Sequence, residues 1–138
     1  MGVAPERVAY GRLLWVGPLA GMAAAAVNVL VYFGASALGA IPEGFVVSGR
    51  TPVTLVPVVI SSFVPAVLGA GLLALLGRFA GRPVRTFRII AGVAVLSSFA
   101  TPITLPGAPV AMMAALILMH VVAAVVIVGV LTTLGRKG

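Results

Sequence analysis

The chain of 138 residues contains no cysteine, and few of its residues carry a charge. Without cysteine it cannot form disulfides, thiolate metal sites, cysteine-bound iron–sulfur clusters or thiol redox centres. Charged residues make up 8 % of the chain, against about 25 % in soluble globular domains. Because this composition leaves too little polar surface to cover a soluble globule, the natural solvent of the chain is a lipid bilayer.

Acidic residues and histidine are scarcer still, because Glu6 and Glu43 are the only acids and His120 is the only histidine. A carboxylate pair for acid–base catalysis inside the bilayer is therefore excluded, and so is a metal site with two histidines from one chain. A single chain could offer a haem one imidazole, and a homodimer could offer two. We expect a non-enzymatic protein without a cofactor.

Long hydrophobic runs are what the sequence does have, and 62 % of its residues are hydrophobic. Four runs are each long enough to cross about 30 Å of hydrocarbon as a helix, and they lack the alternation of barrel strands. They cover residues 13–38, 53–76, 86–105 and 110–134. The sequence therefore predicts one all-α membrane domain over residues 1–138, an integral four-helix bundle with antiparallel up-down topology.

Glycine and proline mark the connections between the runs, at 41–52, 77–85 and 106–109. The last connection is short and uncharged, so the third and fourth runs should form an antiparallel hairpin. The end of the first run has some likeness to a signal-peptidase site, but the run exceeds the 7 to 15 residues of a signal-peptide core. We therefore expect the first run to be a membrane span.

Basic residues predict the orientation, because cytoplasmic connections are enriched in arginine and lysine. Only Arg50 falls on one side of a four-span chain. The other side receives Arg7, Arg12, Arg78, Arg82, Arg85, Arg88, Arg136 and Lys137. This asymmetry predicts that the N-terminus, the middle connection and the C-terminus are cytoplasmic, in a cell inner (plasma) membrane.

The basic residues form no stripe interleaved with aromatics, so nucleic acid is not an expected partner. Membrane lipids are the expected partners instead. Four arginines of the middle connection, Arg78, Arg82, Arg85 and Arg88, could bind anionic lipid headgroups. The alternative is that they serve only to retain the connection in the cytoplasm.

Small and polar residues predict which face of each helix points inward, since membrane helices associate through close contacts of small residues and through side-chain hydrogen bonds. Each run has one such stripe at helical spacing. The stripes are Gly17, Gly21, Ala25 and Asn28; Ser61, Pro65 and Gly69, with Ser62 beside them; Ala91, Ala94, Ser98 and Thr101; and His120 with Ala124. Leucine, valine and isoleucine would then face lipid.

Counting the helical rise from the arginines at the run ends places Asn28, Ser61, Thr101 and His120 at one depth, in the outer half of the bilayer. Together with Ser62 and Ser98 they form a predicted ligand-binding site. His120 is the key member, because an ionisable residue inside a span is by default a functional-site hypothesis.

Three interpretations of His120 remain open at this point. The first is a structural role, here called helix stitching, in which His120 holds helices together through a hydrogen bond to Asn28, to a serine or to a carbonyl freed by Pro65. The second is ligand or substrate binding, and the third is proton or metal chemistry.

Three stretches carry a resemblance to a known family: RLLWVGPLAG (12–21), RPVRTFRII (82–90) and LMHVVAA (118–124). They resemble a family of small bacterial four-helix membrane proteins whose function is unknown. The resemblance extends over nearly the whole chain, and it implies a four-span fold in a bacterial cell membrane. It implies no activity.

The function predicted from the residues is binding of a small or lipidic ligand, or of a partner helix, in a polar pocket of the outer leaflet. An accessory or structural subunit of a larger membrane complex is the first alternative. An oligomeric channel or transporter is the second, and it requires a homo-oligomer because four helices without acidic residues make a poor ion path. The expected partners are lipids, a hydrophobic small molecule, and another copy of the chain or a membrane-complex subunit.

Overall fold

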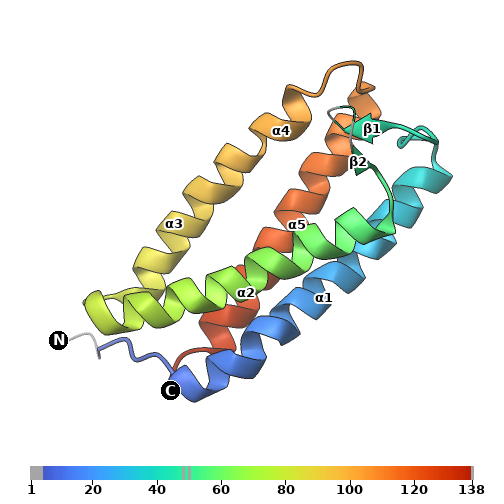
Figure 1. Ribbon diagram of the computed structural model, residues 1–138. Coiled ribbons are helices and arrows are strands. Elements are labelled where there is room, and N and C mark those ends of the chain that lie inside the picture. Colours follow the sequence, from blue (N-terminus) through green and yellow to red (C-terminus); the bar gives the residue numbers. More distant parts are fainter. Residues whose placement is uncertain (1–4, 48, 50, 138) are drawn as a thin grey trace.

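Four long helical spans form the computed structural model, which describes residues 5–47, 49 and 51–137 (Figure 1). Each span is long and apolar enough to cross a membrane, so the predicted all-helical membrane architecture is confirmed at this level. The elements are α1 (Tyr10–Ala37), α2 (Leu55–Phe79), α3 (Pro83–Ser98) continued by α4 (Ala100–Ile103), and α5 (Val110–Leu134). They lie close to the four predicted runs.

Three of the spans form the packed core, and α3 lies at its edge. Helix α1 packs on α2 and α5, whereas α3 packs on α2 and α5 but not to a comparable extent on α1. Within the most apolar stretch of α1, 39 % is buried inside the protein. Within the corresponding stretch of the α3–α4 span, only 11 % is buried. The outermost helix therefore leaves most of its surface unburied.

Small residues bring α1 and α2 into close contact. The predicted stripe of α1, which consists of Gly17, Gly21, Ala25 and Asn28, is buried along its whole length. A Cβ atom on Gly17 would lie 2.8 Å from the Cβ atom of Ala70, and one on Gly21 would lie 2.7 Å from the ring of Phe63. The two backbones can approach this closely only because neither position carries a side chain.

The inward face predicted for α2 is wrong by one residue. Ser61 and Pro65 are exposed, and Gly69 is only half-buried. The buried side chains of α2 are those of Val58, Ser62, Ala66, Ala70 and Leu73. The reason is packing: Ala70 lies against Gly17, Phe63 lies against Gly21, and Ser62 bonds to Asn28, so this face of α2 turns toward α1.

The faces predicted for the third and fourth spans also differ from the structure. In α3 only the first turns, with Pro83, Val84 and Phe87, are buried. In α5 the core residues are Met112, Ala115, Met119, Ile127, Leu131 and Thr132, and His120 and Ala124 are half-buried beside them. Bulky side chains of α5 fill the space against α1, while its small and polar face turns toward α3.

The two ends of the described chain and the α2–α3 connection lie at one end of the molecule (Figure 1). The segment before α1 pairs with the tail: the N–H of Ala9 donates to the carbonyl of Gly135 at 2.8 Å, and that of Lys137 to Arg7 at 2.8 Å. One carboxylate oxygen of Glu6 accepts the N–H of Val84 at 2.8 Å, in the first turn of α3. The N-terminal segment thus joins three parts of the chain.

The opposite end carries a short ribbon in the predicted loop 41–52. Strand β1 (Val46–Val47) pairs antiparallel with β2 (Thr51–Pro52), so Val46 lies opposite Pro52. The phenol of Tyr32 in α1 donates to the carbonyl of Val53 at 3.3 Å and holds the ribbon against the helices. Arg50, predicted to be the one basic residue at this end, lies outside the described residues.

Candidate functional site

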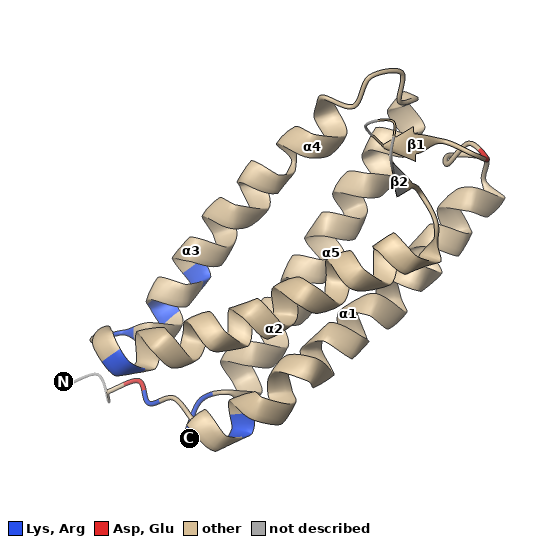
Figure 2. Cartoon of the chain, viewed as in Figure 1, with Lys and Arg blue, Asp and Glu red and all other residues tan. Residues whose placement is uncertain are grey.

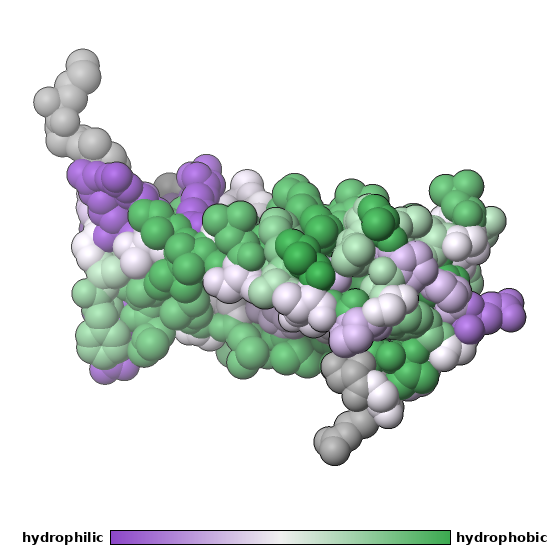
Figure 3. All heavy atoms as spheres, turned by 90° about the horizontal axis from the view of Figure 1, so that it is seen from above, coloured by the Kyte–Doolittle hydropathy of each residue, from purple (hydrophilic) through white to green (hydrophobic). Residues whose placement is uncertain are grey.

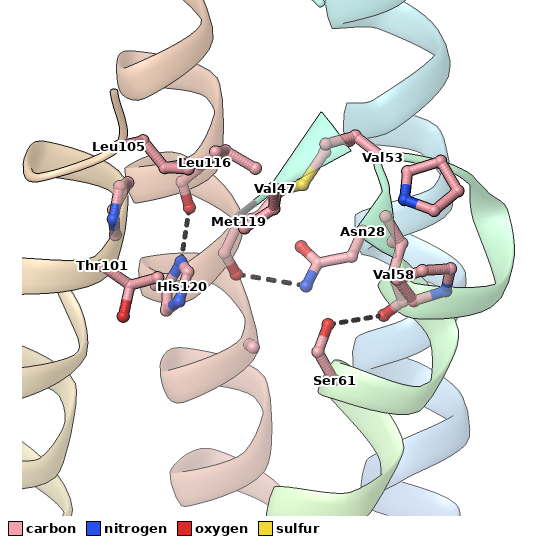
Figure 4. A pocket seen from close by; sticks show the side chains of 14 residues that line it. Asn28, Val47, Val53, Val58, Ser61, Thr101, Leu105, Leu116, Met119 and His120 are labelled. Carbon is pink, nitrogen blue, oxygen red and sulfur yellow. Dashed lines mark hydrogen bonds between the residues drawn. The ribbon is translucent and has the colours of Figure 1, made fainter. Parts of the chain in front are cut away.

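A cavity of about 330 Å³ lies between α1, α2, α4 and α5, next to the ribbon (Figure 4). The residues predicted to share one depth come together in its wall, namely Asn28, Ser61, Thr101 and His120. The prediction that these four residues lie at one level is therefore confirmed, although the faces of α2 and α5 were misjudged. Val47, Pro52 and Val53 of the ribbon region form part of the same wall.

Asn28 is the polar centre of the cavity wall and is 3 % exposed. Its amide nitrogen donates to the hydroxyl of Ser62 at 2.9 Å and to the backbone carbonyl of Met119 at 3.1 Å. Ser62 is 1 % exposed and donates its own proton to the carbonyl of Val58 at 2.8 Å. One side chain of α1 is thus bonded to both α2 and α5.

The same hydrogen bonds fix which way the amide of Asn28 points. The carbonyl of Met119 can only accept, and the hydroxyl of Ser62 has already given its proton to Val58, so both need the NH₂ group. The amide oxygen, Oδ1, is left without a hydrogen-bond partner in the described part of the chain. In Figure 4 this oxygen lies on the side of the amide away from Ser61.

His120 also lines the cavity, but among the described residues it hydrogen-bonds only within its own helix. Its Nδ1 lies 2.6 Å from the carbonyl of Leu116, which can only accept, so Nδ1 carries the proton. In the neutral ring, Nε2 is then an acceptor. Phe99 packs edge-to-face on the imidazole, with ring centroids 6.4 Å apart.

The predicted stitching role of His120 is therefore wrong in its proposed form. Within residues 5–47, 49 and 51–137, His120 makes no hydrogen bond to Asn28, to a serine or to the carbonyl that Pro65 leaves free. Asn28 performs that role instead. The sequence could not show this, because a backbone acceptor such as the carbonyl of Met119 has no side-chain signature.

A second cavity of about 580 Å³ lies between α2, α3 and α5. The predicted residue Ser98 lines this cavity and not the first. Its wall is mostly apolar and includes Leu68, Leu72, Phe87, Ile90, Ala91, Ala94 and Ile127. Ser61, His120 and Ala123 belong to the walls of both cavities.

The serine hydroxyls of the two walls, Ser61 and Ser98, already use their protons. Ser61 donates to Val58 at 3.2 Å, and Ser98 donates to Val95 at 2.6 Å, each in its own helix. Their oxygens remain acceptors, as does the amide oxygen of Asn28. No described residue in either wall is acidic or basic apart from His120, and the described residues contain no group of three metal-ligating side chains. The site can therefore accept a hydrogen bond from a neutral donor group on a ligand.

The four arginines predicted to face lipid headgroups are exposed at the end that holds the termini (Figure 2). Arg88 differs from Arg78, Arg82 and Arg85, because its guanidinium donates to the hydroxyl of Thr132 in α5 at 3.2 Å. Arg88 thereby links α3 to α5, a role that spacing alone did not indicate.

Comparison with known proteins agrees with the resemblance seen in the sequence. No curated protein and no solved structure matches the chain. One family model does match, and it extends from residue 8 to residue 137, which is nearly the whole chain. The chain therefore belongs to the family of unknown function DUF6069.

Proposed function

We propose that this protein binds a small or lipidic molecule with a hydrogen-bond donor in the cavity at Asn28 and His120, and that it catalyses no reaction. The observation that carries the proposal is the amide oxygen of Asn28, which is buried, fixed in direction and unpartnered among the described residues. Leaving such an acceptor unpaired costs about 1–3 kcal/mol. A donor on a ligand would offset this cost.

The proposal includes an orientation in a bacterial inner membrane, with antiparallel spans and both termini in the cytoplasm. The basic residues of the described chain gather at one end of the molecule (Figure 2). Apolar side chains cover its middle on the face seen in Figure 3. Under the positive-inside rule the basic end is cytoplasmic, which places the cavity in the outer half of the bilayer.

The exposed arginines would then lie at the level of the cytoplasmic headgroups. Arg78, Arg82 and Arg85 are suited there to anionic lipids, at about 1 kcal/mol for each residue near the surface. This role accompanies ligand binding and does not replace it.

An accessory subunit of a membrane complex is the second candidate function. The observation that favours it is the outward face of α3, where Ile89, Val93 and Leu96 are 59 %, 60 % and 69 % exposed at helical spacing. A partner helix or a second copy could pack on this face. The oligomeric channel or transporter predicted as a further alternative has no comparable observation in its favour.

Native mass spectrometry of the protein purified in mild detergent tests the proposal. We expect a bound mass on the wild type and at least about a fivefold loss of it in His120→Phe, the loss that corresponds to one neutral hydrogen bond. This variant keeps a ring against Phe99 but removes Nε2. Thr133→Val is the matched control, because Thr133 is an exposed residue of α5 that lines neither cavity.

Equal bound masses on the wild type and both variants would contradict the proposal, and so would three equally empty proteins. Either result would make the accessory-subunit function the better one. Co-purification of a partner would then be the next observation to seek.

A further inference from the structure

We infer that the two cavities form one site for a single amphiphile: a neutral hydroxyl head in the polar cavity and its hydrocarbon chain in the apolar one. The inference rests on the proposed function and names the class of ligand. The head would donate to the amide oxygen of Asn28 or to Nε2 of His120, and the chain would lie between α2, α3 and α5.

The walls of the cavities show where head and chain would join. Ser61, His120 and Ala123 line both, so the two spaces adjoin along these residues. Ala123 lies about one turn from His120 on α5, and its short side chain adds little bulk where the two walls meet. Volumes of about 330 and 580 Å³ are each within the usual range for ligand pockets, about 300–1,000 Å³.

The apolar cavity follows from the way α3 is held. Only the first turns of α3 are buried, where Glu6 bonds the helix and Phe87 packs into the core. Beyond Phe87, the residues that α3 turns toward α5 include Ala91 and Ala94, which are too short to fill the space. The helix is thus fixed at one end, and the cavity lies along its remainder.

The rim of this cavity is accessible from the bilayer. Leu68 of α2 is 68 % exposed and Ile90 of α3 is 39 % exposed, and both contribute to its wall. A hydrocarbon chain could therefore enter sideways from lipid, without crossing the ribbon that borders the polar cavity.

The chemistry of the walls selects the head. The unpartnered acceptors, Oδ1 of Asn28 and Nε2 of His120, require a donor, and no described residue of either wall supplies a formal charge to pair with an ionised head. Burying an unpaired ammonium, phosphate or carboxylate in such a site is strongly unfavourable. A hydroxyl group meets both conditions, whereas a phospholipid could place only one of its chains in the apolar cavity.

The test uses a photoactivatable analogue of hexadecan-1-ol, with a diazirine in mid-chain and a terminal alkyne. The full-length protein is labelled in nanodiscs of phosphatidylcholine and phosphatidylglycerol, and labelled residues are mapped by mass spectrometry. Excess hexadecan-1-ol and excess hexadecane are the two competitors. They differ only in the head, so their comparison isolates its contribution.

We expect labels on apolar-cavity residues such as Leu72, Ile90 and Ile127, removed by hexadecan-1-ol but not by hexadecane. His120→Phe or Asn28→Leu, depending on which of the two acceptors holds the head, should lower this labelling about fivefold, as for one hydrogen bond. Ala94→Trp, which fills only the apolar cavity, should lower it as strongly. Ala100→Trp is the matched control, because this exposed residue of the same span lines neither cavity.

Equal competition by the alcohol and the alkane would overturn the inference, because the cavity would then hold any chain. Labelling that both His120→Phe and Asn28→Leu leave unchanged would overturn it as well, because neither acceptor would then hold the head. A bound mass that His120→Phe removes and Ala94→Trp leaves intact would also overturn it, while the proposed function would stand. An empty wild type in native mass spectrometry would instead contradict the proposed function itself. Retained thermal stability of each variant shows that a loss of labelling is not a loss of fold.

Discussion

Asn28 and His120 line the same cavity from different helices, but they make different kinds of hydrogen bond. Asn28 bonds across to α2 and α5, whereas His120 bonds to the carbonyl of Leu116 one turn away. The uncharged amide therefore contributes to the assembly of the helices. The imidazole, which is the more conspicuous residue in the sequence, keeps a nitrogen available to the cavity.

This difference predicts the order of stability of two variants. Asn28→Ala removes two interhelical hydrogen bonds, each worth about 0.6 kcal/mol on average in membranes, and should lower the free energy of unfolding by about 1 kcal/mol. His120→Ala should lower it less, because no bond between helices is lost. Unfolding in mixed detergent micelles measures both.

Ser62→Ala serves as the intermediate control, because it removes one of the two bonds of Asn28 and leaves the other. A larger loss of stability in His120→Ala than in Asn28→Ala would contradict this assignment and would restore the stitching role to His120.

At this scale the sequence predicted depth but not hydrogen-bond partners. Counting a fixed rise per residue placed Asn28, Ser61 and His120 together, and they do share a cavity. The direction in which a side chain points is harder to predict, because each residue rotates the helix by about 100°. The face predicted for α2 therefore centred on Ser61, whereas Ser62, the residue beside it, is the partner of Asn28.

At the scale of helices, the α1–α2 contact depends on glycine. Gly17→Ala should lower the free energy of unfolding by about 1–3 kcal/mol, the usual effect of overpacking, because its Cβ would lie 2.8 Å from that of Ala70. Gly34→Ala, in the same helix with open space around it, is the control and should not destabilise. Thermal unfolding in detergent measures both, and equal effects would contradict close packing at Gly17.

The N-terminal segment holds the start of α3 through Glu6. Its carboxylate accepts the N–H groups of Val84 and Arg85 at 2.8 and 3.3 Å, as a capping residue does, although it comes from a distant part of the chain. Glu6→Ala should lower the free energy of unfolding by about 1 kcal/mol, as does loss of an N-cap. Hydrogen exchange at these two amides should accelerate.

Glu43→Ala is the control for this change, because Glu43 is exposed in the connection between α1 and β1. Unchanged exchange at the start of α3 in Glu6→Ala would show that the contact does not hold the helix. No local sequence pattern indicated this cap, since Glu6 and Val84 are 78 positions apart.

For the whole molecule, hydrophobic run length was sufficient to predict four membrane-spanning helices, because the thickness of a bilayer sets the length of a span. The peripheral position of α3 was not predictable in this way. It depends on where the bulky residues of α5 pack. Because they pack against α1, only the first turns of α3 are buried, and a cavity lies along its remainder.

The proposed orientation can be tested with single cysteines, because the natural chain has none. In intact cells, a membrane-impermeant maleimide should label Glu43→Cys, in the connection after α1, but not Gly81→Cys, in the connection between α2 and α3. Both should be labelled after permeabilisation, which shows that both sites are accessible. The reverse pattern in intact cells would place the termini outside and the cavity in the inner half of the bilayer.

The most direct test of ligand binding at Asn28 is an experimental density map of the protein purified from its own membrane. We predict density from a non-protein group within hydrogen-bond distance, about 3 Å, of the amide oxygen of Asn28, continuing past His120. A map in which a protein group bonds this oxygen, or in which side chains fill the cavity, would contradict a ligand site.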